Sequence, residues 1–499
     1  MMNPLVTVRG GPIRGREERR AGRPVQVFLG IPYAAPPVGP RRWQPPEPAR
    51  PWTAPLDAGV FGPAAPQVGP PPTELPEAAL AAGPTDEDCL TLNVWAPSGA
   101  RDRPVLVWFH GGAFLSGSSA NPSYDGARLA ARHDVVVVSA NYRLGALGFA
   151  PVLGHANLGL LDQVLVLEWV RDQIEVFGGD PGRVTAFGES AGGGSVLHLL
   201  ASPRAGGLLQ RAIVQSGATT LTPGPDGAAE VADRIRRALA PLTPLNATVD
   251  DVLAAQTTVL MEMAATTGLM PYHPSVDAVV VPAPPVEALA AASAADVDLL
   301  IGTTADELRL FLDAGAWSLD RAGLERRAGR YLHGRGVDGP GPVLAAYDGL
   351  ATPTDVWAAL QTDGEMWLPA LAAAEAHHRA GRGRTWMYRF DWPAAPPHER
   401  LGSCHAIDIP FTFSSFDHGG WEAFVGGGEA ALTLSATLQE AWVAFAATGD
   451  PSTAHLGDWP AYEPTRRSTM VLDRSPKLLT DPRGTVRRAW STAAAAGPA

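Results

Sequence analysis

Short apolar runs that alternate with helix-like stretches organise the chain from about residue 105 onward. Val105–Phe109 and Val135–Val138 are near-continuous apolar runs, which is typical of strands buried on both faces of a sheet. Leu158–Val176 has helical spacing and is followed by Gly178-Gly179, which favours a helix stop. Strands that alternate with helices predict an α/β fold with a large, mostly parallel central sheet covered by helices on both faces. Further strands are predicted at 184–187, 212–214, 299–301 and 386–390, and a further helix at 191–200.

Three regions depart from this alternation. Residues 34–85 are rich in Pro, Gly and Ala, and we expect long ordered loops there. The ranges 225–295 and 318–380 are rich in alanine and contain helical stretches. We interpret them as helical insertions on the sheet, so that residues 1–499 form a single domain.

The charge balance of the chain restricts its partners. The sequence has 39 Lys and Arg against 51 Asp and Glu, a net charge of −12 at pH 7. Nucleic acids and anionic membrane surfaces require a basic footprint, so a small molecule is the expected partner. The sequence has no apolar stretch of about 18 residues and no secretory signal, which favours a cytoplasmic location. Whether the chain is a monomer or a homodimer is left open.

Other polar groups receive structural interpretations. The charge run Arg16–Arg20 is expected to be a solvated turn, and His377 and His378 are expected to face solvent. Cys89 and Cys404 are the two cysteines, and one disulfide between them is possible. No P-loop, Rossmann fingerprint, H-E-x-x-H or paired C-x-x-C occurs, so neither a cofactor nor a metal is predicted.

The sharpest local motif surrounds Ser190. Gly188-Glu189-Ser190-Ala191-Gly192 is a G-x-S-x-G pentapeptide between a predicted strand and a predicted helix. Such a strained turn lifts the serine above the sheet, and its two glycines relieve crowding between strand and helix. The pattern predicts a nucleophilic serine with helix N-terminal N–H groups beside it.

A second glycine-rich motif, His110–Phe114, follows the predicted strand at 105–109. Small residues allow backbone N–H groups to approach an oxyanion, as acyl transfer requires. We assign the oxyanion-hole donors to Gly112, Ala113 and Ala191. The alternative interpretation is a tight loop without a catalytic role.

Several longer motifs resemble the type-B carboxylesterase family, which also contains cholinesterases and bacterial p-nitrobenzyl-type esterases. The segments that carry the resemblance lie in order along almost the whole chain: Phe28–Ala34 with Pro36–Gly39, Glu87–Val94, Phe177–Gly192 and Trp442–Pro451 with Trp459-Pro460. The resemblance implies an α/β-hydrolase fold. Gly62–Asp88 has no aromatic residue, whereas cholinesterases have a choline-binding tryptophan in this region, so choline esters are not the expected substrates.

The resemblance also implies a catalytic triad. It places the base at His405, in Gly402–Pro410, and the orienting acid at Glu307, in Ile301–Glu307. Asp306 is the competing carboxylate. Glu189 and Ser216 match positions that support the triad electrostatically in the family, with ordinary polar packing as the alternative.

The expected activity is that of a serine carboxylic-ester hydrolase, which acts through an acyl-enzyme on neutral short- to medium-chain esters. One alternative is the same machinery acting on a specialised carbamate, amide, polyester or bulky-alcohol ester. Another is a catalytically inactive, neuroligin-like binding protein. Loss of the nucleophile characterises such relatives, whereas this chain keeps Ser190, Glu307 and His405.

Overall fold

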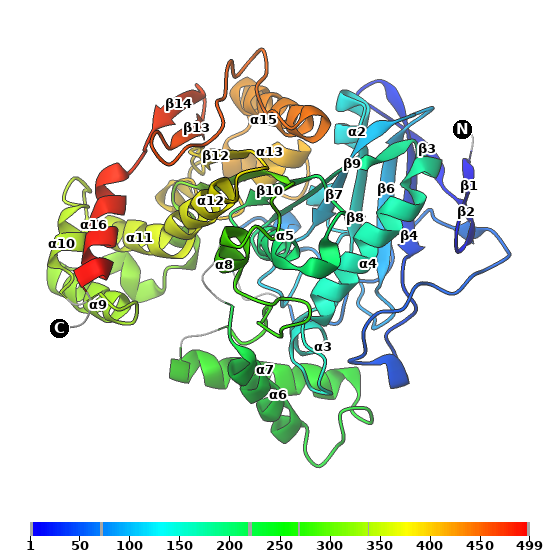
Figure 1. Ribbon diagram of the computed structural model, residues 1–499, viewed down its shortest axis with the longest axis horizontal. Coiled ribbons are helices and arrows are strands. Elements are labelled where there is room, and N and C mark those ends of the chain that lie inside the picture. The colour runs from blue at the N-terminus through cyan, green and yellow to red at the C-terminus, as the bar shows by residue number, and fades with distance from the viewer. Residues whose placement is uncertain (1–2, 70–72, 218–221, 268–269, 338, 497–499) are drawn as a thin grey trace.

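The computed structural model describes residues 3–69, 73–217, 222–267, 270–337 and 339–496. Within this part of the chain, a twisted sheet of eleven strands forms the centre of the molecule (Figure 1). Its strands, in spatial order, are β14 (Lys477–Thr480), β13 (Ser468–Leu472), β12 (Thr385–Phe390), β11 (Asp298–Thr304), β10 (Arg211–Gln215), β9 (Gly179–Glu189), β7 (Arg103–Phe109), β8 (Val136–Ala140), β6 (Thr91–Pro97), β4 (Arg23–Pro32) and β3 (Arg16–Arg20).

The sheet is parallel from β8 to β13 and antiparallel at both ends. The predicted parallel centre is confirmed. A separate small sheet lies near the N-terminus and consists of β1 (Leu5–Val8), β2 (Gly11–Arg14) and β5 (Leu56–Asp57).

The apolar run in β7 shows why this strand forms in the middle of the sheet. Val105, Val107 and Phe109 belong to one core cluster, whereas Leu106 and Trp108 belong to the cluster on the other face. Alternate side chains of a strand point to opposite faces, so a strand covered on both sides needs apolar residues at every position.

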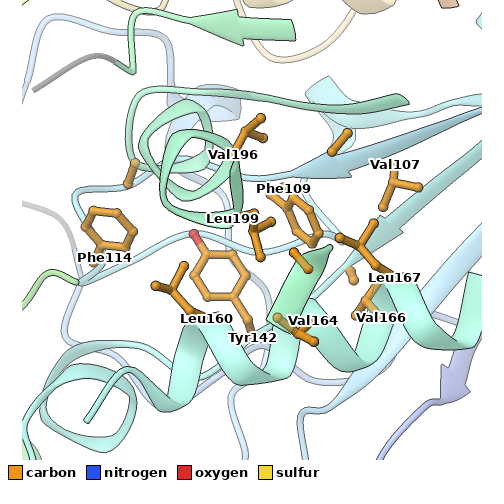
Figure 2. Packing of buried hydrophobic residues seen from close by; sticks show 14 of the residues in the cluster. Val107, Phe109, Phe114, Tyr142, Leu160, Val164, Val166, Leu167, Val196 and Leu199 are labelled. Atoms are coloured by element: carbon orange, nitrogen blue, oxygen red, sulfur yellow. The ribbon is translucent and has the colours of Figure 1, made fainter. Parts of the chain in front are cut away.

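Helices cover the two faces of the sheet. Figure 2 shows the first cluster, in which α4 and α5 side chains pack with Phe109 and Tyr142. The helices of this face are α4 (Leu158–Gln173), α5 (Ala191–Ala201), α8 (Pro285–Ala290) and α12 (Leu368–Ala380). The helices of the opposite face are α2 (Ala127–His133), α13 (Ile409–Phe413) and α15 (Gly428–Thr448).

A buried ion pair fastens the loop after β8 to α4. The Arg143 guanidinium donates to both carboxylate oxygens of Asp162, at 2.8 and 2.7 Å, and the Arg143 backbone N–H donates to the same carboxylate. The side chains of both residues are almost completely buried.

Two helices of the 225–295 range protrude from the sheet, whereas α8 packs on it. These are α6 (Pro225–Leu239) and α7 (Val249–Thr267), which pack on one another at the bottom of Figure 1. The remaining short helices outside both ranges are α1 (Glu77–Leu80), α3 (Gly145–Phe149) and α14 (Trp421–Val425).

The 318–380 range and the C-terminal helix form a third, smaller core cluster. It joins α9 (Arg321–His333), α10 (Gly341–Ala345), α11 (Pro353–Thr362) and α16 (Gly484–Ala496), which gather around the C-terminus in Figure 1.

Asp363 anchors this cluster because it accepts hydrogen bonds from the Tyr347 hydroxyl at 2.8 Å and the Arg483 guanidinium at 2.6 Å. The indole N–H of Trp490, on α16, donates to the Tyr347 hydroxyl at 3.0 Å. Asp363 is also the first residue of a π-helical segment, Asp363–Trp367, between α11 and α12.

Two local expectations are wrong. Arg16–Arg20 is not a turn but the edge strand β3, whose charged side chains suit an edge that must not pair with other chains. His377 is buried rather than solvated, because its imidazole lies on the sheet side of α12 and contacts Thr385 Oγ1 and the Val297 carbonyl.

Cys89 and Cys404 are both buried free thiols in different core clusters, so they form no disulfide with each other.

Candidate active site

The functional residues predicted from the sequence gather at one edge of the sheet. Ser190 directly follows β9, Glu307 lies just beyond β11, and His405 lies in the connection after β12. Gly112 and Ala113 lie in the loop after β7. Because these strands are parallel neighbours or near neighbours, their carboxyl ends meet at the same edge.

Ser190 occupies a strained turn between β9 and α5. Its φ of 57° and ψ of −125° are unusual for a residue with a side chain. The Ser190 N–H donates to the Gln215 carbonyl at 2.9 Å, and its carbonyl accepts from the Gly194 N–H at 2.8 Å, so the turn is held from both sides. Gly192 must lack a side chain, because a Cβ there would collide with the Phe109 carbonyl.

The loop after β7 lies against this turn. A Cβ on Gly111 would be 3.1 Å from the Ser190 Cβ. Gly112 has a φ of 112°, and Ala113 and Phe114 follow with φ values of 55° and 59°. Below the loop, His110 stacks on Tyr142 with ring centroids 4.5 Å apart, and the Tyr142 hydroxyl donates to the His110 carbonyl at 2.6 Å.

The predicted donors Gly112, Ala113 and Ala191 are thus brought around Ser190. Apart from the bonds within regular helices and strands, these three N–H groups donate no backbone hydrogen bond in the described part of the chain. Ala191 is the first residue of α5, where a backbone N–H has no partner within the helix.

His405 and Glu307 form a tight buried pair. The His405 Nδ1 lies 2.6 Å from Glu307 Oε2, and Glu307 Oε1 accepts from the Thr304 N–H at 2.8 Å. The competing Asp306 instead interacts with Arg309 Nε at 3.1 Å and the Ser403 N–H at 3.0 Å. The structure therefore brings Glu307, and not Asp306, to the imidazole.

Glu189 lies on the other side of the imidazole. Its Oε1 is 3.3 Å from His405 Nε2, and the side chain is buried. Burial raises the pKa of Glu189 to about 8, although the nearby imidazole opposes this rise. Burial alone would lower the pKa of His405, but the carboxylates of Glu189 and Glu307 outweigh it and raise the pKa to about 9.

Ser216 lies at the end of β10, with its backbone N–H donating to the Gly302 carbonyl at 2.9 Å. Its side chain is buried, and the hydroxyl finds no hydrogen-bond partner among the described residues. Ser216 lines a cavity beside Ser190. Within the described residues, its hydroxyl makes no hydrogen bond to the His405 imidazole. Its predicted supporting role stays a prediction.

Sequence reasoning missed a third buried carboxylate near the His405 imidazole, that of Asp408. Asp408 accepts from Gln215 Nε2 at 2.7 Å, and burial raises its pKa to about 6. The sequence signal that could have pointed to Asp408 is its position three residues after the predicted base His405.

Of the aromatic residues near catalytic positions, Phe114 lines the cavity, and the Phe311 ring lies 5.3 Å from that of His405, whereas Phe411 and Phe413 are core residues.

No group of three or more His, Cys, Asp or Glu side chains suited to a metal ion occurs within the described ranges. None of the helices in this part of the chain is long and apolar enough to cross a membrane.

Comparison with known proteins gives consistent matches along the chain. The Carboxylesterase family profile matches residues 2–327 and 348–490. The para-nitrobenzyl esterase of Bacillus subtilis is 38% identical over 507 residues, covering 98% of both chains. The phenmedipham hydrolase of Pseudarthrobacter oxydans is 34% identical, covering 89% of this chain and 91% of that protein.

Solved structures agree with these matches. A PNB esterase structure superposes with a TM-score of 0.82 at 36% identity, covering 98% of this chain and 100% of the other. A carboxylesterase of Geobacillus stearothermophilus gives a TM-score of 0.84 at 36% identity, covering 97% and 99%. The expected α/β-hydrolase fold is confirmed.

Proposed function

Because the chain belongs to the carboxylesterase family and is a carboxylic ester hydrolase, we propose that it cleaves neutral short- to medium-chain esters through an acyl-enzyme on Ser190. The observation that carries this proposal is the buried His405–Glu307 pair, whose imidazole Nε2 lies 3.3 Å from the carboxylate of Glu189, the residue directly before a serine in a strained turn. Nucleophile, base and orienting acid are the parts that acyl transfer by a serine requires.

In the first half of the reaction, Ser190 Oγ attacks the ester carbonyl carbon while His405 Nε2 takes the hydroxyl proton. The carbonyl oxygen becomes an oxyanion, which the N–H groups of Gly112, Ala113 and Ala191 stabilise. The bond from carbon to the alkoxy oxygen then breaks, and His405 returns the proton to the departing alcohol. In the second half, water loses a proton to His405 and attacks the acyl carbon; the bond from that carbon to Ser190 Oγ then breaks, His405 returns the proton to Oγ, and the acid leaves.

Glu307 holds the imidazole in the tautomer that presents Nε2 as a base, because its carboxylate accepts from Nδ1–H. In their ionised forms, Glu189 and Asp408 place further negative charge near the imidazole, which favours the imidazolium that forms during both halves. We include Ser216 as a positioning residue beside Ser190. The proposed location is the bacterial cytoplasm, and the two free thiols are consistent with a reducing compartment.

A second candidate is a specialised substrate handled by the same machinery. The similarity to a protein named phenmedipham hydrolase favours including a carbamate among the test compounds. Both the ester and the carbamate reaction would depend on Ser190.

The experiment is hydrolysis of p-nitrophenyl esters from acetate to decanoate, together with an aryl carbamate, by the wild type and by Ser190→Ala. We expect ester hydrolysis by the wild type and loss of about 10⁶-fold in kcat in the variant, the scale found when a serine nucleophile is removed. A Ser190→Ala protein that keeps its wild-type melting temperature shows that the loss is chemical. Turnover by this variant at the wild-type rate would contradict the assignment of the nucleophile.

A further inference from the structure

A cavity of about 140 Å³ opens beside Ser190. Its wall combines the loop after β7, the first turn of α5, the end of β10, and segments from both helical ranges. The wall residues that bear on its shape are Ala113, Phe114, Gly194, Met270, Tyr272 and Met366. Within the described part of the chain, no residue of the Glu307 turn or of the His405 loop contributes to this wall.

This one-sided wall decides which part of the substrate the cavity receives. In the proposed mechanism the alcohol departs toward His405, because that imidazole protonates it. The carbonyl oxygen points to the N–H groups of Gly112, Ala113 and Ala191. The remaining substituent of the tetrahedral carbon is the acyl chain, and it must point away from His405.

Resting on the proposed function, we propose that this cavity receives the acyl group, that it suits apolar acyl groups of about six carbons, and that Gly194 sets its size, whereas the alcohol leaves past an exposed aromatic surface.

Gly194 is the third of three consecutive glycines at the start of α5, although glycine destabilises a helix relative to alanine. Close packing explains why Gly192 and Gly193 lack a side chain. A Cβ on Gly192 would collide with the Phe109 carbonyl, and one on Gly193 would lie 2.7 Å from the Gln215 carbonyl oxygen. At Gly194 the nearest atoms to a Cβ would be the Gly217 carbonyl oxygen at 3.3 Å and Phe114 Cζ at 3.6 Å, so a methyl group fits once the Gly217 carbonyl shifts by a few tenths of an ångström. The space that Gly194 leaves is part of the cavity.

The volume gives the size of the acyl group. A protein cavity of about 150 Å³ lined by apolar side chains accommodates a benzene ring. The 140 Å³ beside Ser190 therefore suits a benzoyl or hexanoyl group. Met270 and Met366 supply flexible, polarizable walls that adapt to either shape. His273 also lines the cavity, and burial lowers its pKa, so this imidazole offers no cation to an acyl chain that ends in a carboxylate.

The alcohol side differs. The Phe311 ring lies 5.3 Å from the His405 ring, yet Phe311 is 55% exposed. An alcohol that leaves past His405 thus meets a solvent-exposed aromatic surface.

The test uses two substrate series with purified full-length protein. The first varies the acyl group of p-nitrophenyl esters from acetate to decanoate, and the second varies the alcohol of hexanoate esters from ethyl to p-nitrobenzyl. For the wild type, kcat/KM should rise to hexanoate and fall by decanoate, but change little along the alcohol series. In Gly194→Ala the ratio of kcat/KM for acetate to that for hexanoate should rise roughly tenfold or more, since the space of one methylene in a pocket is worth about 10- to 200-fold.

Two further variants keep this test interpretable. Gly227→Ala is the matched control, because Gly227 lies in the first turn of α6 and its Cβ would meet Pro223 at the same 3.3 Å, far from the cavity wall. It should leave the ratio unchanged. Met366→Ala enlarges the cavity and should shift the optimum to longer acyl chains.

A Gly194→Ala effect on the alcohol series instead of the acyl series would overturn the proposal, and so would unchanged ratios in an active variant. These outcomes differ from failure of the proposed function, in which the wild type hydrolyses no ester or Ser190→Ala stays active.

Discussion

Replacement of Glu307 by glutamine tests the triad most directly, because the amide has nearly the same shape but a fixed donor and acceptor. One carboxylate oxygen of Glu307 accepts from the Thr304 N–H and the other from His405 Nδ1. In Glu307→Gln, the amide oxygen can keep the hydrogen bond from the Thr304 N–H. The amide NH₂ then faces His405 Nδ1. The imidazole must then carry its proton on Nε2, where it cannot accept the proton of Ser190. The flipped amide accepts from Nδ1–H but faces the Thr304 N–H with its own NH₂, so this orientation carries a donor–donor contact and the first orientation is favoured.

The expected magnitude follows from the wrong tautomer. A carboxylate-to-amide change at the orienting acid of a serine protease triad lowers kcat by about 10⁴, which corresponds to about 5.4 kcal/mol of transition-state stabilisation. We therefore expect kcat for p-nitrophenyl butyrate to fall on the order of 10⁴-fold in Glu307→Gln. Thermal unfolding followed by circular dichroism would show whether the variant keeps the wild-type fold.

Asp306→Asn is the matched control, because Asp306 is the adjacent carboxylate and its side chain bonds Arg309 and Ser403 rather than the imidazole. Its kcat should stay within about tenfold of the wild type, since the triad's own hydrogen bonds are kept. A large loss in Asp306→Asn together with near-normal activity in Glu307→Gln would refute the reasoning and make Asp306 the orienting acid.

Three further predictions concern stability and pH. Asp162→Ala leaves the buried Arg143 guanidinium without its carboxylate and should lower the free energy of unfolding by about 3–5 kcal/mol, measured by urea denaturation; a change below about 1 kcal/mol, as for a surface pair, would contradict this. Because the catalytic base is the unprotonated imidazole and its pKa is raised to about 9, kcat/KM should still increase with pH above the ordinary histidine value of about 6.5. Glu189→Gln removes a carboxylate that raises the pKa of His405, so the acidic limb should move to lower pH; a limb that moves up or stays in place would argue against this electrostatic role.

The centre of the sheet and the turn at Ser190 could both be predicted from the sequence, because each allows only certain residue types. Strands buried on both faces require unbroken apolar runs such as Val105–Phe109, and the turn at Ser190 requires small neighbours such as Gly192. The antiparallel strands at the N-terminal side were less visible. The edge strand Arg16–Arg20 has only charged residues, so its pairing is set by β4 rather than by its own pattern.

The cavity wall could not be predicted from the sequence. Met270 and Met366 are almost 100 residues apart, and each reaches Ser190 only because its helical range folds back over the sheet edge. His377 shows the same limit on a small scale. Its partners Thr385 and the Val297 carbonyl come from other segments, so helical spacing alone could not distinguish a buried imidazole from a solvated one.

The anchoring of Asp363 gives the chain end a role in selectivity. Arg483 and, through Tyr347, Trp490 of α16 hold the first residue of the π-helical segment that carries Met366. The last helix is thus a buttress for one wall of the substrate cavity, although it contributes no residue to that wall. We therefore expect replacement of Arg483 or Trp490 to alter which esters the protein prefers more than it alters the chemistry at Ser190.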